Sequence, residues 1–494
     1  MIVAGNRNET CKIKQNTGGK RMETEKIISY FKEISSIPRQ SGDEKAVSDY
    51  LTAFAKELGL WVKQDKDYNV LVKKPATKGM EKRDTIILQG HMDMVYVVAQ
   101  GMEHCYQNGI EVIDDGVFLH ANGTTLGADN GIALAYAMML MAEKDIPLPP
   151  LEFIFTSKEE IGLLGGASAD ISELEGKMII NLDSEEEGMF CSGCAGGIGA
   201  CIKLPIEKEK AEIPLVPLHI SIGGLKGGHS GMEIQLERGN AIQLIGRVLQ
   251  RLEKYDARIG ETESIGKFNA IANTGEILCY VKEEALSKVK EEIAELEREL
   301  KNELSPADDV QFIVREEEIV SDCEVFTKKT AETLKNFLVL MLQGVMNMSA
   351  AVEGLVQTSI NTGCMEEKEG CLLFHSALRS SVETQKQFLI SRIQTIVDVL
   401  GMECKWSGEY PGWQYRENSK LREIATEKYR ELFGKEPKIE AVHAGLECGY
   451  WAEKIKDADI LSIGPDMIDV HTPNEKVSKQ SIENVWELLK AILS

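Results

Sequence analysis

The chain has 494 residues, which suggests roughly two to four domains of about 150 residues each, and its 43% hydrophobic and 27% charged content is ordinary for a globular protein. The formal net charge of −23 argues against nucleic acids and anionic membranes as partners, because proteins bind both through basic patches. No stretch of the sequence reaches the roughly 20 apolar residues of a membrane-spanning helix.

The cysteines and the N-terminal residues indicate where the protein works. The 11 cysteines are an odd number without framework spacing, which is typical of reduced thiols in a cytoplasm. Residues 1–21 are polar and lack the apolar segment of a secretory signal. We therefore predict a cytoplasmic protein, with a disordered extension over residues 1–21 and Met22 as an alternative start of translation.

The first part of the chain alternates between helix and strand patterns. Apolar residues recur at helical spacing from Glu25, and a second helical stretch passes through Phe54. A further helix is expected over residues 130–144, between strands expected at 69–72, 85–89, 151–156 and 178–182. Strands that alternate with helices indicate an α/β sheet covered on both faces.

The pattern changes from about Pro217 to Gly408, where a series of elements ordered αββαβ occurs twice. Two such passes predict an α+β lid made of two ferredoxin-like lobes. After Gly412 the α/β pattern returns, but this last segment is too short to form a sheet of its own. We therefore predict a mixed-sheet α/β catalytic domain formed by residues 22–196 and 412–494, with a lid inserted at 197–411.

Acidic residues and histidines follow the predicted strands or precede the predicted helix. They are His91, Asp93, Asp129, Glu159, Glu160 and Asp183, and the stretch IDVHTPNEKV adds His471. In open α/β sheets, ligands bind at the carboxyl ends of the strands, so we expect these side chains to converge there. Each acid alone has an ordinary explanation as a helix cap or a turn residue. Together they would repel one another unless cations neutralised them.

The charges favour a pair of divalent ions. Asp129, Glu160 and Asp183 supply three negative charges, so two divalent ions and one hydroxide would make the site formally neutral. Imidazole and carboxylate ligands suit zinc, although cobalt and manganese remain alternatives. Asp93 lies two residues from His91 and can orient its imidazole. Glu159 can take a proton from a water that bridges the metals and deliver it to a leaving group.

Several motifs of this chain also occur in a known enzyme family. They are GHMDMV, GADNG, NLDSEE, GCAGG, GGLKGGHSG, HAGLECG and SIGP followed by HTPNEKV. With these motifs the chain resembles the two-metal zinc exopeptidases, which include aminoacylases, carboxypeptidase G and carnosine-cleaving dipeptidases. The resemblance implies that Asp129 bridges the metals, with His91 and Asp183 on one ion and Glu160 and His471 on the other. It implies Glu159 as the general base and Asp93 as the orienting acid.

The resemblance also implies substrate-binding residues outside the metal site, namely His229, Asn269, Arg379 and Gly445. His229 would stabilise the tetrahedral oxyanion, and Arg379 would grip a terminal carboxylate through two hydrogen bonds. Gly445 could offer its backbone to the substrate because no side chain obstructs it. Taken alone, however, the segment around His229 is equally consistent with a glycine-rich turn, and Arg379 by itself is more typical of a surface arginine.

The function implied by the resemblance is metal-dependent hydrolysis of dipeptides, with Xaa-His dipeptides such as carnosine as the expected substrates. A general dipeptidase and a deacylase of N-acyl amino acids are alternatives with the same chemistry. A non-catalytic binding protein on the same fold would be expected to lack Glu159 or a metal ligand, and this chain has them all. The expected partner is a small peptide. We expect a single chain in which the second lobe takes the place of a lid that a partner chain would otherwise supply. A homodimer is the alternative.

Overall fold

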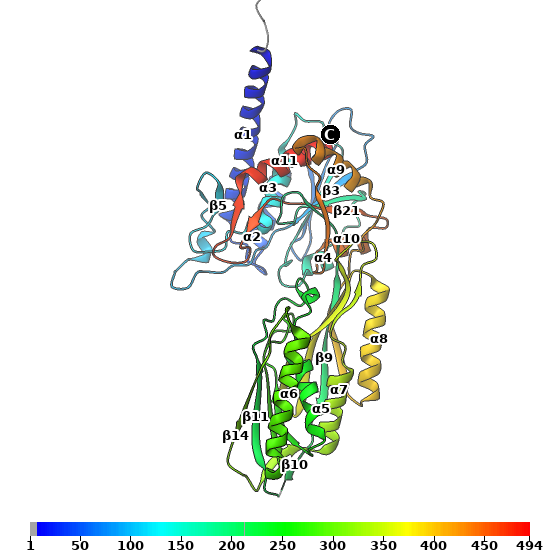
Figure 1. Ribbon diagram of the computed structural model, residues 1–494. Coiled ribbons are helices and arrows are strands. Elements are labelled where there is room, and N and C mark those ends of the chain that lie inside the picture. Colours follow the sequence, from blue (N-terminus) through cyan, green and yellow to red (C-terminus); the bar gives the residue numbers. More distant parts are fainter. Residues whose placement is uncertain (1–6, 212) are drawn as a thin grey trace, which may run out of the picture. The chain divides into compact units, whose positions relative to one another are not determined.

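The computed structural model describes the backbone of residues 7–211 and 213–494, with side chains from Lys20 onward (Figure 1). By its internal contacts, the described chain divides into two compact units. Unit 1 comprises the chain up to Gly193 together with Tyr415–Ala441 and Leu446–Ser494. Unit 2 comprises Cys194–Gln414 and Val442–Gly445.

Unit 1 is built on a mixed sheet with the strand order β1-β2-β6-β3-β7-β21-β8-β20. The strands β6, β3, β7 and β21 run parallel to one another, whereas β1 pairs antiparallel with β2, β2 with β6, and β8 with β21. This arrangement confirms the predicted α/β class with a mixed sheet. The strands are β1 (Trp61–Gln64), β2 (Val70–Lys74), β3 (Ile86–His91), β6 (Leu151–Thr156), β7 (Met178–Asn181), β8 (Met189–Cys194), β20 (Lys438–Val442) and β21 (Asp459–Ser462).

The central strands of this sheet are covered on both faces. Every residue of β3 and β6 is buried, as expected for parallel strands that lie between two layers of helices. Near the end of β3, a Cβ atom added to Gly90 would lie 2.5 Å from Asn130 Oδ1 and 2.7 Å from Ala133 Cβ. Glycine at this position therefore allows the first turn of α3 (Ala128–Ala142) to lie directly against the end of β3.

Helices α1, α3 and α11 pack together in unit 1, as Figure 1 shows. The ring of Tyr136 in α3 stacks on that of Trp486 in α11, with 6.4 Å between the centroids. A small sheet with the order β22-β23-β5-β4 completes the unit. The bounds of these and other elements are α1 (Arg7–Ser35), α2 (Lys45–Glu57), α4 (Leu164–Ser168), α9 (Lys420–Phe433), α10 (Cys448–Lys454), α11 (Lys479–Leu493), β4 (Ile113–Asp114), β5 (Phe118–His120), β22 (Met467–Ile468) and β23 (Lys476–Ser478).

The start of α1 differs from the expectation based on the sequence. The helix begins at Arg7, inside the segment 1–21 that was expected to be disordered, while residues 1–6 lie outside the described residues. The apolar spacing on which the expectation was based begins only near Ile27, which is buried, so the sequence could not reveal the earlier turns. Among the described helices, none combines the length and the apolar character needed to cross a membrane.

Unit 2 contains two antiparallel sheets of related topology among its described residues. One has the order β12-β13-β11-β14 and contacts α5 and α6, and the other has the order β16-β17-β18-β9-β19 and contacts α8. A short pair, β10 and β15, lies beside them. The elements are β9 (Gly196–Pro205), β10 (Lys208–Ala211), β11 (Val216–Gly223), α5 (Ala241–Glu253), β12 (Arg258–Glu263), β13 (Gly275–Val281), α6 (Leu286–Leu304), β14 (Gln311–Glu316), β15 (Cys323–Phe326), α7 (Lys328–Leu340), β16 (Gly344–Met348), β17 (Val356–Lys368), β18 (Cys371–Ser380), α8 (Glu383–Val399) and β19 (Glu403–Tyr410).

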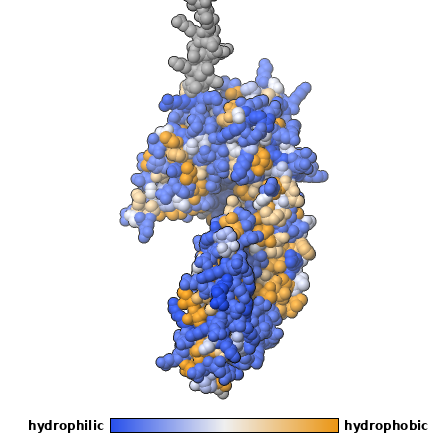
Figure 2. Space-filling model, in the orientation of Figure 1, coloured by the Kyte–Doolittle hydropathy of each residue, from blue (hydrophilic) through white to orange (hydrophobic). Residues whose placement is uncertain are grey.

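The two lobes of unit 2 share one strand order. When β11 to β14 are numbered in chain order, the order in the sheet is 2-3-1-4, and β9, β17, β18 and β19 give the same order. This is the repeat that the two αββαβ passes predicted. The lobes also share a continuous buried core that joins residues such as Leu218 of β11 and Phe374 of β18. Hydrophobic side chains gather over α8 in Figure 2, where Phe388 and Val399 are exposed.

The short segment Val442–Gly445 belongs to unit 2, although the sequence-based boundaries place it within the second catalytic part, 412–494. The Ala195 amide donates hydrogen bonds to the carbonyl oxygens of Val442 (3.2 Å) and Ala444 (3.0 Å). The imidazole of His443 also pairs with the hydroxyl of Ser359, at 2.7 Å. These contacts connect residues far apart in the sequence, so no local pattern could have placed the boundary there.

Candidate active site

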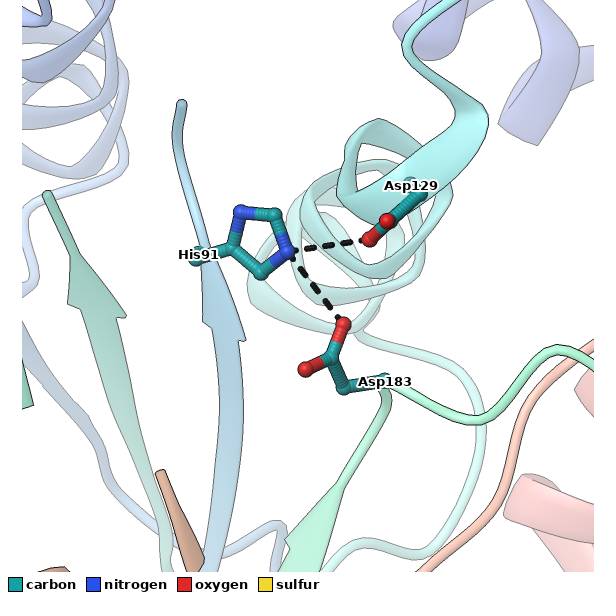
Figure 3. Close-up of side chains that lie close together, drawn as sticks. All are labelled: His91, Asp129 and Asp183. Carbon is teal, nitrogen blue, oxygen red and sulfur yellow. Dashed lines mark hydrogen bonds and ion pairs between the residues drawn. The ribbon is translucent and has the colours of Figure 1, made fainter. Parts of the chain in front are cut away.

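Three side chains from the ends of adjacent elements of unit 1 point toward one another (Figure 3). His91 ends β3, Asp129 lies at the start of α3, and Asp183 follows β7 by two residues. The Nε2 atom of His91 lies 3.0 Å from Asp129 Oδ1 and 3.3 Å from Asp183 Oδ1. The strand order places β3 beside β7, which explains why residues far apart in the sequence meet.

The other oxygen of Asp129 faces a second histidine. The Nε2 atom of His471 lies 3.1 Å from Asp129 Oδ2 and 2.8 Å from Glu160 Oε1. The two oxygens of one carboxylate are therefore each beside a different imidazole. This arrangement has the form that a bridging ligand would need.

The donor atoms of these residues fit divalent metal ions. Among the described residues, three groups of possible ligands have atoms within 4.8 Å of one another: His91 with Asp129 and Asp183, Asp129 with Glu160 and His471, and His91 with Glu159 and Glu160. Imidazole nitrogens combined with carboxylate oxygens match the ligand preferences of zinc and related ions. The first two groups share Asp129, so the arrangement fits a pair of ions.

The protonation of these residues reflects an excess of negative charge. Hydrogen bonds to Asp129 and Glu160, assisted by their charges, raise the pKa of His471 to about 11. Burial, followed by the charges of Asp129 and Glu160, raises the pKa of Asp183 to about 6, against the opposing effect of His91. Burial favours the neutral form of His91, but Asp183 and Asp129 outweigh it and raise the pKa of the imidazole. Such a cluster attracts protons or other cations.

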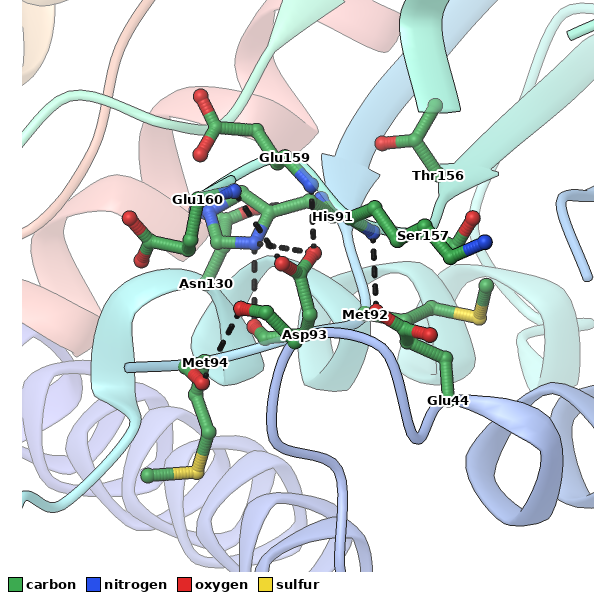
Figure 4. Close-up of polar contacts among 12 residues, drawn as sticks. Glu44, His91, Met92, Asp93, Met94, Asn130, Thr156, Ser157, Glu159 and Glu160 are labelled. Atoms are coloured by element: carbon green, nitrogen blue, oxygen red, sulfur yellow. Dashed lines mark hydrogen bonds and ion pairs between the residues drawn. The ribbon is translucent and has the colours of Figure 1, made fainter. Parts of the chain in front are cut away.

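Asp93 connects the histidine at the end of β3 to the loop after β6, as Figure 4 shows. The Nδ1 atom of His91 lies 3.1 Å from the Asp93 carbonyl oxygen and 3.5 Å from the Asp93 carboxylate. Because these oxygens only accept, Nδ1 carries a proton. In the metal-free protein the carboxylates of Asp129 and Asp183 likewise accept from Nε2–H, and loss of that second proton would leave the Nε2 lone pair for a cation. The Asp93 carboxylate also accepts the amides of Glu159 (3.0 Å) and Glu160 (3.2 Å).

Asp93 remains ionised despite its position. Burial alone would raise the pKa of this carboxyl group, but the hydrogen bond and charge of His91, together with the Glu159 amide, outweigh burial and lower it. The orienting contact nevertheless comes mainly from the Asp93 carbonyl, which is closer to His91 than the carboxylate is. The sequence suggested a role for the side chain and could not distinguish the two.

The pKa of the Glu159 carboxyl group shifts in the opposite direction to that of Asp93. Burial raises the pKa of its carboxyl group well above the usual value, and the charges of Asp183, Glu160 and Glu447 add to this shift, while His91 opposes it. A carboxyl group with a raised pKa can take up a proton and return it near neutral pH.

Two residues that the sequence analysis did not single out hold together the elements that end at the site. Asn130 accepts the His91 amide at 3.1 Å and donates to the Leu182 carbonyl at 2.7 Å, which links β3, α3 and the end of β7. Glu447 is buried, and its carboxyl group accepts from Gln89 and Thr156, each at 2.6 Å. Burial raises the pKa of Glu447 to about 8. Asn130 lies in the motif GADNG and Glu447 in the motif HAGLECG. Their place in these motifs was the signal from which the sequence could have identified them.

His229 lies in unit 2 in a glycine-rich loop that fixes its tautomer. Its Nδ1 atom accepts hydrogen bonds from the amides of Gly231 (3.2 Å) and Met232 (3.0 Å). In the neutral ring the proton is therefore on Nε2, which can act as a donor. Burial, followed by the positive charge of Arg379, lowers the pKa of His229 and keeps the ring neutral.

The remaining predicted residues also lie in unit 2. Arg379, in β18, is nearly buried and donates from Nη1 to the Tyr410 hydroxyl at 2.9 Å, a partner that the sequence did not suggest. Among the described residues, no hydrogen-bond partner of Arg379 Nε is found. The carbonyl of Asn269 accepts the Ser230 amide at 2.9 Å, next to His229. Gly445 ends the segment Val442–Gly445.

Comparisons with known proteins agree on one family. A family model described as Peptidase family M20/M25/M40 matches residues 87–494. The chain is 33% identical over 475 residues to the cytosol non-specific dipeptidase of Escherichia coli (strain K12), covering 96% of this chain and 98% of that protein.

Two solved structures also match the chain over most of its length. Aminoacylhistidine dipeptidase from Vibrio alginolyticus matches with a TM-score of 0.89 and 33% identity, over 94% of this chain and 96% of that one. Aminopeptidase PepT from Bacillus cereus, with 18% identity and a TM-score of 0.53 over 95% of this chain and 98% of that one, shares the fold.

Proposed function

The chain belongs to the M20/M25/M40 peptidase family, and from this premise we propose that it hydrolyses dipeptides with the help of two divalent metal ions. The observation that supports this most strongly is the position of Asp129, whose two oxygens lie beside His91 and His471. We propose Asp183 as the further ligand on the His91 side and Glu160 as the further ligand on the His471 side.

We propose zinc as the pair of ions, with cobalt or manganese as alternatives, because the ligands are imidazoles and carboxylates. When bound, such ions would activate a water molecule and polarise the carbonyl group of the scissile peptide bond. The position of His91 suits this proposal, since Asp93 holds one proton on Nδ1, so the proton on Nε2 is the one that a cation would replace.

Glu159 is proposed to move the proton during hydrolysis. It takes a proton from the attacking water as the water oxygen bonds to the carbonyl carbon. It then delivers the proton to the amine nitrogen as the carbon–nitrogen bond breaks, so the carboxylate is regenerated. The raised pKa of Glu159, caused first by its burial, supports this exchange.

The residues of unit 2 are proposed to bind the substrate. The Nε2–H group of His229 would donate to the oxyanion that forms on the carbonyl oxygen, and its neutral, fixed tautomer supports that role. Arg379 would bind the terminal carboxylate through the edge that is not occupied by Tyr410. Asn269 and Gly445 are proposed as further substrate contacts.

The names of the two full-length relatives differ in the substrate that they indicate. One is named a non-specific dipeptidase and the other an aminoacylhistidine dipeptidase. We propose Xaa-His dipeptides such as carnosine as preferred substrates, with a general dipeptidase as the alternative.

A panel of β-Ala-His, Gly-His, Ala-Ala and N-acetyl amino acids tests this. Higher kcat/KM for the two histidine dipeptides is expected. Equal rates on Ala-Ala would favour the general dipeptidase, and hydrolysis of the N-acetyl compounds alone would contradict both. Loss of hydrolysis on chelation, with recovery on addition of zinc, is expected as well.

We also propose that the protein acts in the cytoplasm as a single chain, with a homodimer as the alternative. The name of the Escherichia coli relative and the reduced cysteines support the location. The doubled lobe of unit 2 supports the single chain. Gel filtration with an activity assay tests this, because activity confined to dimer fractions would contradict it.

A further inference from the structure

The loop before Asp129 is held by a buried carboxylate from the C-terminal part of the chain. Glu475 accepts hydrogen bonds from the backbone amides of the three residues that precede Asp129, at 2.8, 3.0 and 2.7 Å. Two of these amides directly precede α3 and the third belongs to its first residue, so one carboxylate gives all three a partner. Since Glu475 follows His471 by four residues, it connects the loop of His471 to the loop of Asp129.

Arg39 holds the same loop from another direction. Its buried guanidinium donates from Nη1 to the carbonyl oxygens of Met92 (3.0 Å) and Asp93 (3.1 Å), and from Nη2 to the carbonyl oxygen of Gly127. Met92 and Asp93 directly follow His91. One side chain therefore connects the end of β3 to the start of α3.

Both contacts meet at Gly127. Its amide donates to Glu475, and its carbonyl accepts from Arg39. A Cβ atom at Gly127 or at Gly131 would lie 2.6 or 2.7 Å from Arg39 Nη2, so both glycines make room for the guanidinium. This gives the glycines of the GADNG motif a structural role, because they let a buried arginine reach the loops that carry the proposed ligands.

The burial of both charges needs a reason. A buried arginine or glutamate is costly unless hydrogen bonds compensate, and here the compensation comes from backbone groups of two loops. Neither side chain lies in a group of possible metal ligands among the described residues. Their hydrogen bonds therefore fix the backbone that carries the ligands.

We propose that Arg39 and Glu475 are positioning residues that hold Asp129 between His91 and His471. This inference rests on the proposed two-metal function, because it concerns the carboxylate that would bridge the ions. Each oxygen of Asp129 lies beside one of the two imidazoles. A loosened loop would therefore weaken the binding of both ions together, whereas removal of the His471 imidazole would weaken mainly one.

Glu475→Gln and Arg39→Lys, made separately, test this proposal. Each protein is stripped of metal and titrated with Zn²⁺ against a competing chelator, and the Co²⁺-loaded form is examined by visible absorption. We expect both variants to fold by circular dichroism, to bind both Zn²⁺ equivalents about 10- to 100-fold more weakly, and to show an altered Co²⁺ spectrum.

The matched control is Glu152→Gln. Glu152 is also a buried glutamate of unit 1 and accepts the amides of Glu175 (3.0 Å) and Gly176 (2.9 Å), but it lies at the other end of β6 from Glu159. This variant should keep the Zn²⁺ affinity and the Co²⁺ spectrum of the wild type.

Three results would overturn the proposal. They are unchanged Zn²⁺ affinity and Co²⁺ spectrum in both folded variants, an equal loss of affinity in Glu152→Gln, and loss of the fold in both variants, since a positioning residue leaves the rest of its unit intact. Failure of the wild-type protein to bind two ions would instead contradict the proposed function, so the two failures can be told apart.

Discussion

Two sets of residues differ in how many of their polar atoms already have partners. They are the proposed metal residues of unit 1 and the proposed substrate residues of unit 2. In unit 1, both ring nitrogens of His91 and both carboxylate oxygens of Asp129 have polar neighbours. In unit 2, no hydrogen-bond partner is found among the described residues for Arg379 Nε, which belongs to a proposed substrate residue. Buried polar atoms usually have partners, so this open donor of Arg379 is suited to a ligand.

The difference follows from the elements that carry the two sets. His91 ends a fully buried strand, and Arg39 and Glu475 fix the loop of Asp129. His229 lies in a glycine-rich loop, where only two backbone amides fix the ring. The comparison supports a proposed metal site whose geometry is set by the fold and a proposed substrate site that is completed by its ligand.

The largest effect is expected for Asp129→Ala. Because its carboxylate lies beside both His91 and His471, its loss should remove both ions and abolish hydrolysis. Metal analysis after dialysis and the rate of dipeptide hydrolysis measure this. Asp170→Ala, which removes an exposed ion pair with Lys63, is the control and should behave as wild type. Retention of one ion at wild-type affinity would contradict a bridging role.

Glu159→Gln should keep both ions and lose turnover. The amide cannot take a proton from water, and loss of a general base typically lowers kcat about 100- to 10,000-fold. Steady-state kinetics combined with metal analysis measures this. Glu160→Gln is the contrasting variant, because it should lose an ion as well. Wild-type turnover by Glu159→Gln would rule out its proposed role.

Metal affinity should rise with pH. In the metal-free protein the pKa of His471 is raised to about 11, and that of His91 is raised too, so both rings are protonated at neutral pH. A ligand must lose its proton to bind an ion, so the apparent affinity should increase up to about tenfold per pH unit for each proton released. Calorimetric titrations in buffers with different ionisation enthalpies count these protons. An affinity that falls as pH rises would contradict the assignment of the histidines as ligands.

The smallest effect is expected for Tyr410→Phe. Arg379 would lose the hydroxyl that accepts its Nη1–H group, a hydrogen bond worth about 0.5–1.5 kcal/mol. KM should rise about two- to tenfold with little change in kcat, because the chemistry lies elsewhere. Tyr255→Phe removes another hydroxyl of unit 2, bonded to Glu292, and should change neither parameter. A fall in kcat at constant KM would show that Tyr410 acts on the reaction itself.

The strands that carry the site could be predicted because they are continuous apolar runs. The strand expected at 151–156 coincides with β6, and that expected at 178–182 ends one residue beyond β7. The small sheet β22-β23-β5-β4 could not be predicted, because strands of two or three residues have no detectable period. The repeated lobe topology could be predicted, because both passes have long helices and strands.

The five proposed metal residues could be singled out because most of them follow a predicted strand or begin a helix. Their proximity is a property of the structure, and their role as ligands stays a prediction. Arg39 gave no local sign, and for Glu475 the signal was only its place in the motif HTPNEKV. Their partners are backbone groups 88 and 347 residues away in the sequence, at Gly127 and Ala128, and only the folded chain brings them together.

The central claim is that two ions lie on either side of Asp129. Anomalous diffraction at the zinc absorption edge, from crystals of the zinc-loaded protein, tests it most directly. We expect two peaks that share Asp129, one beside His91 and Asp183 and the other beside His471 and Glu160. A single peak, or peaks that do not contact Asp129, would contradict the claim.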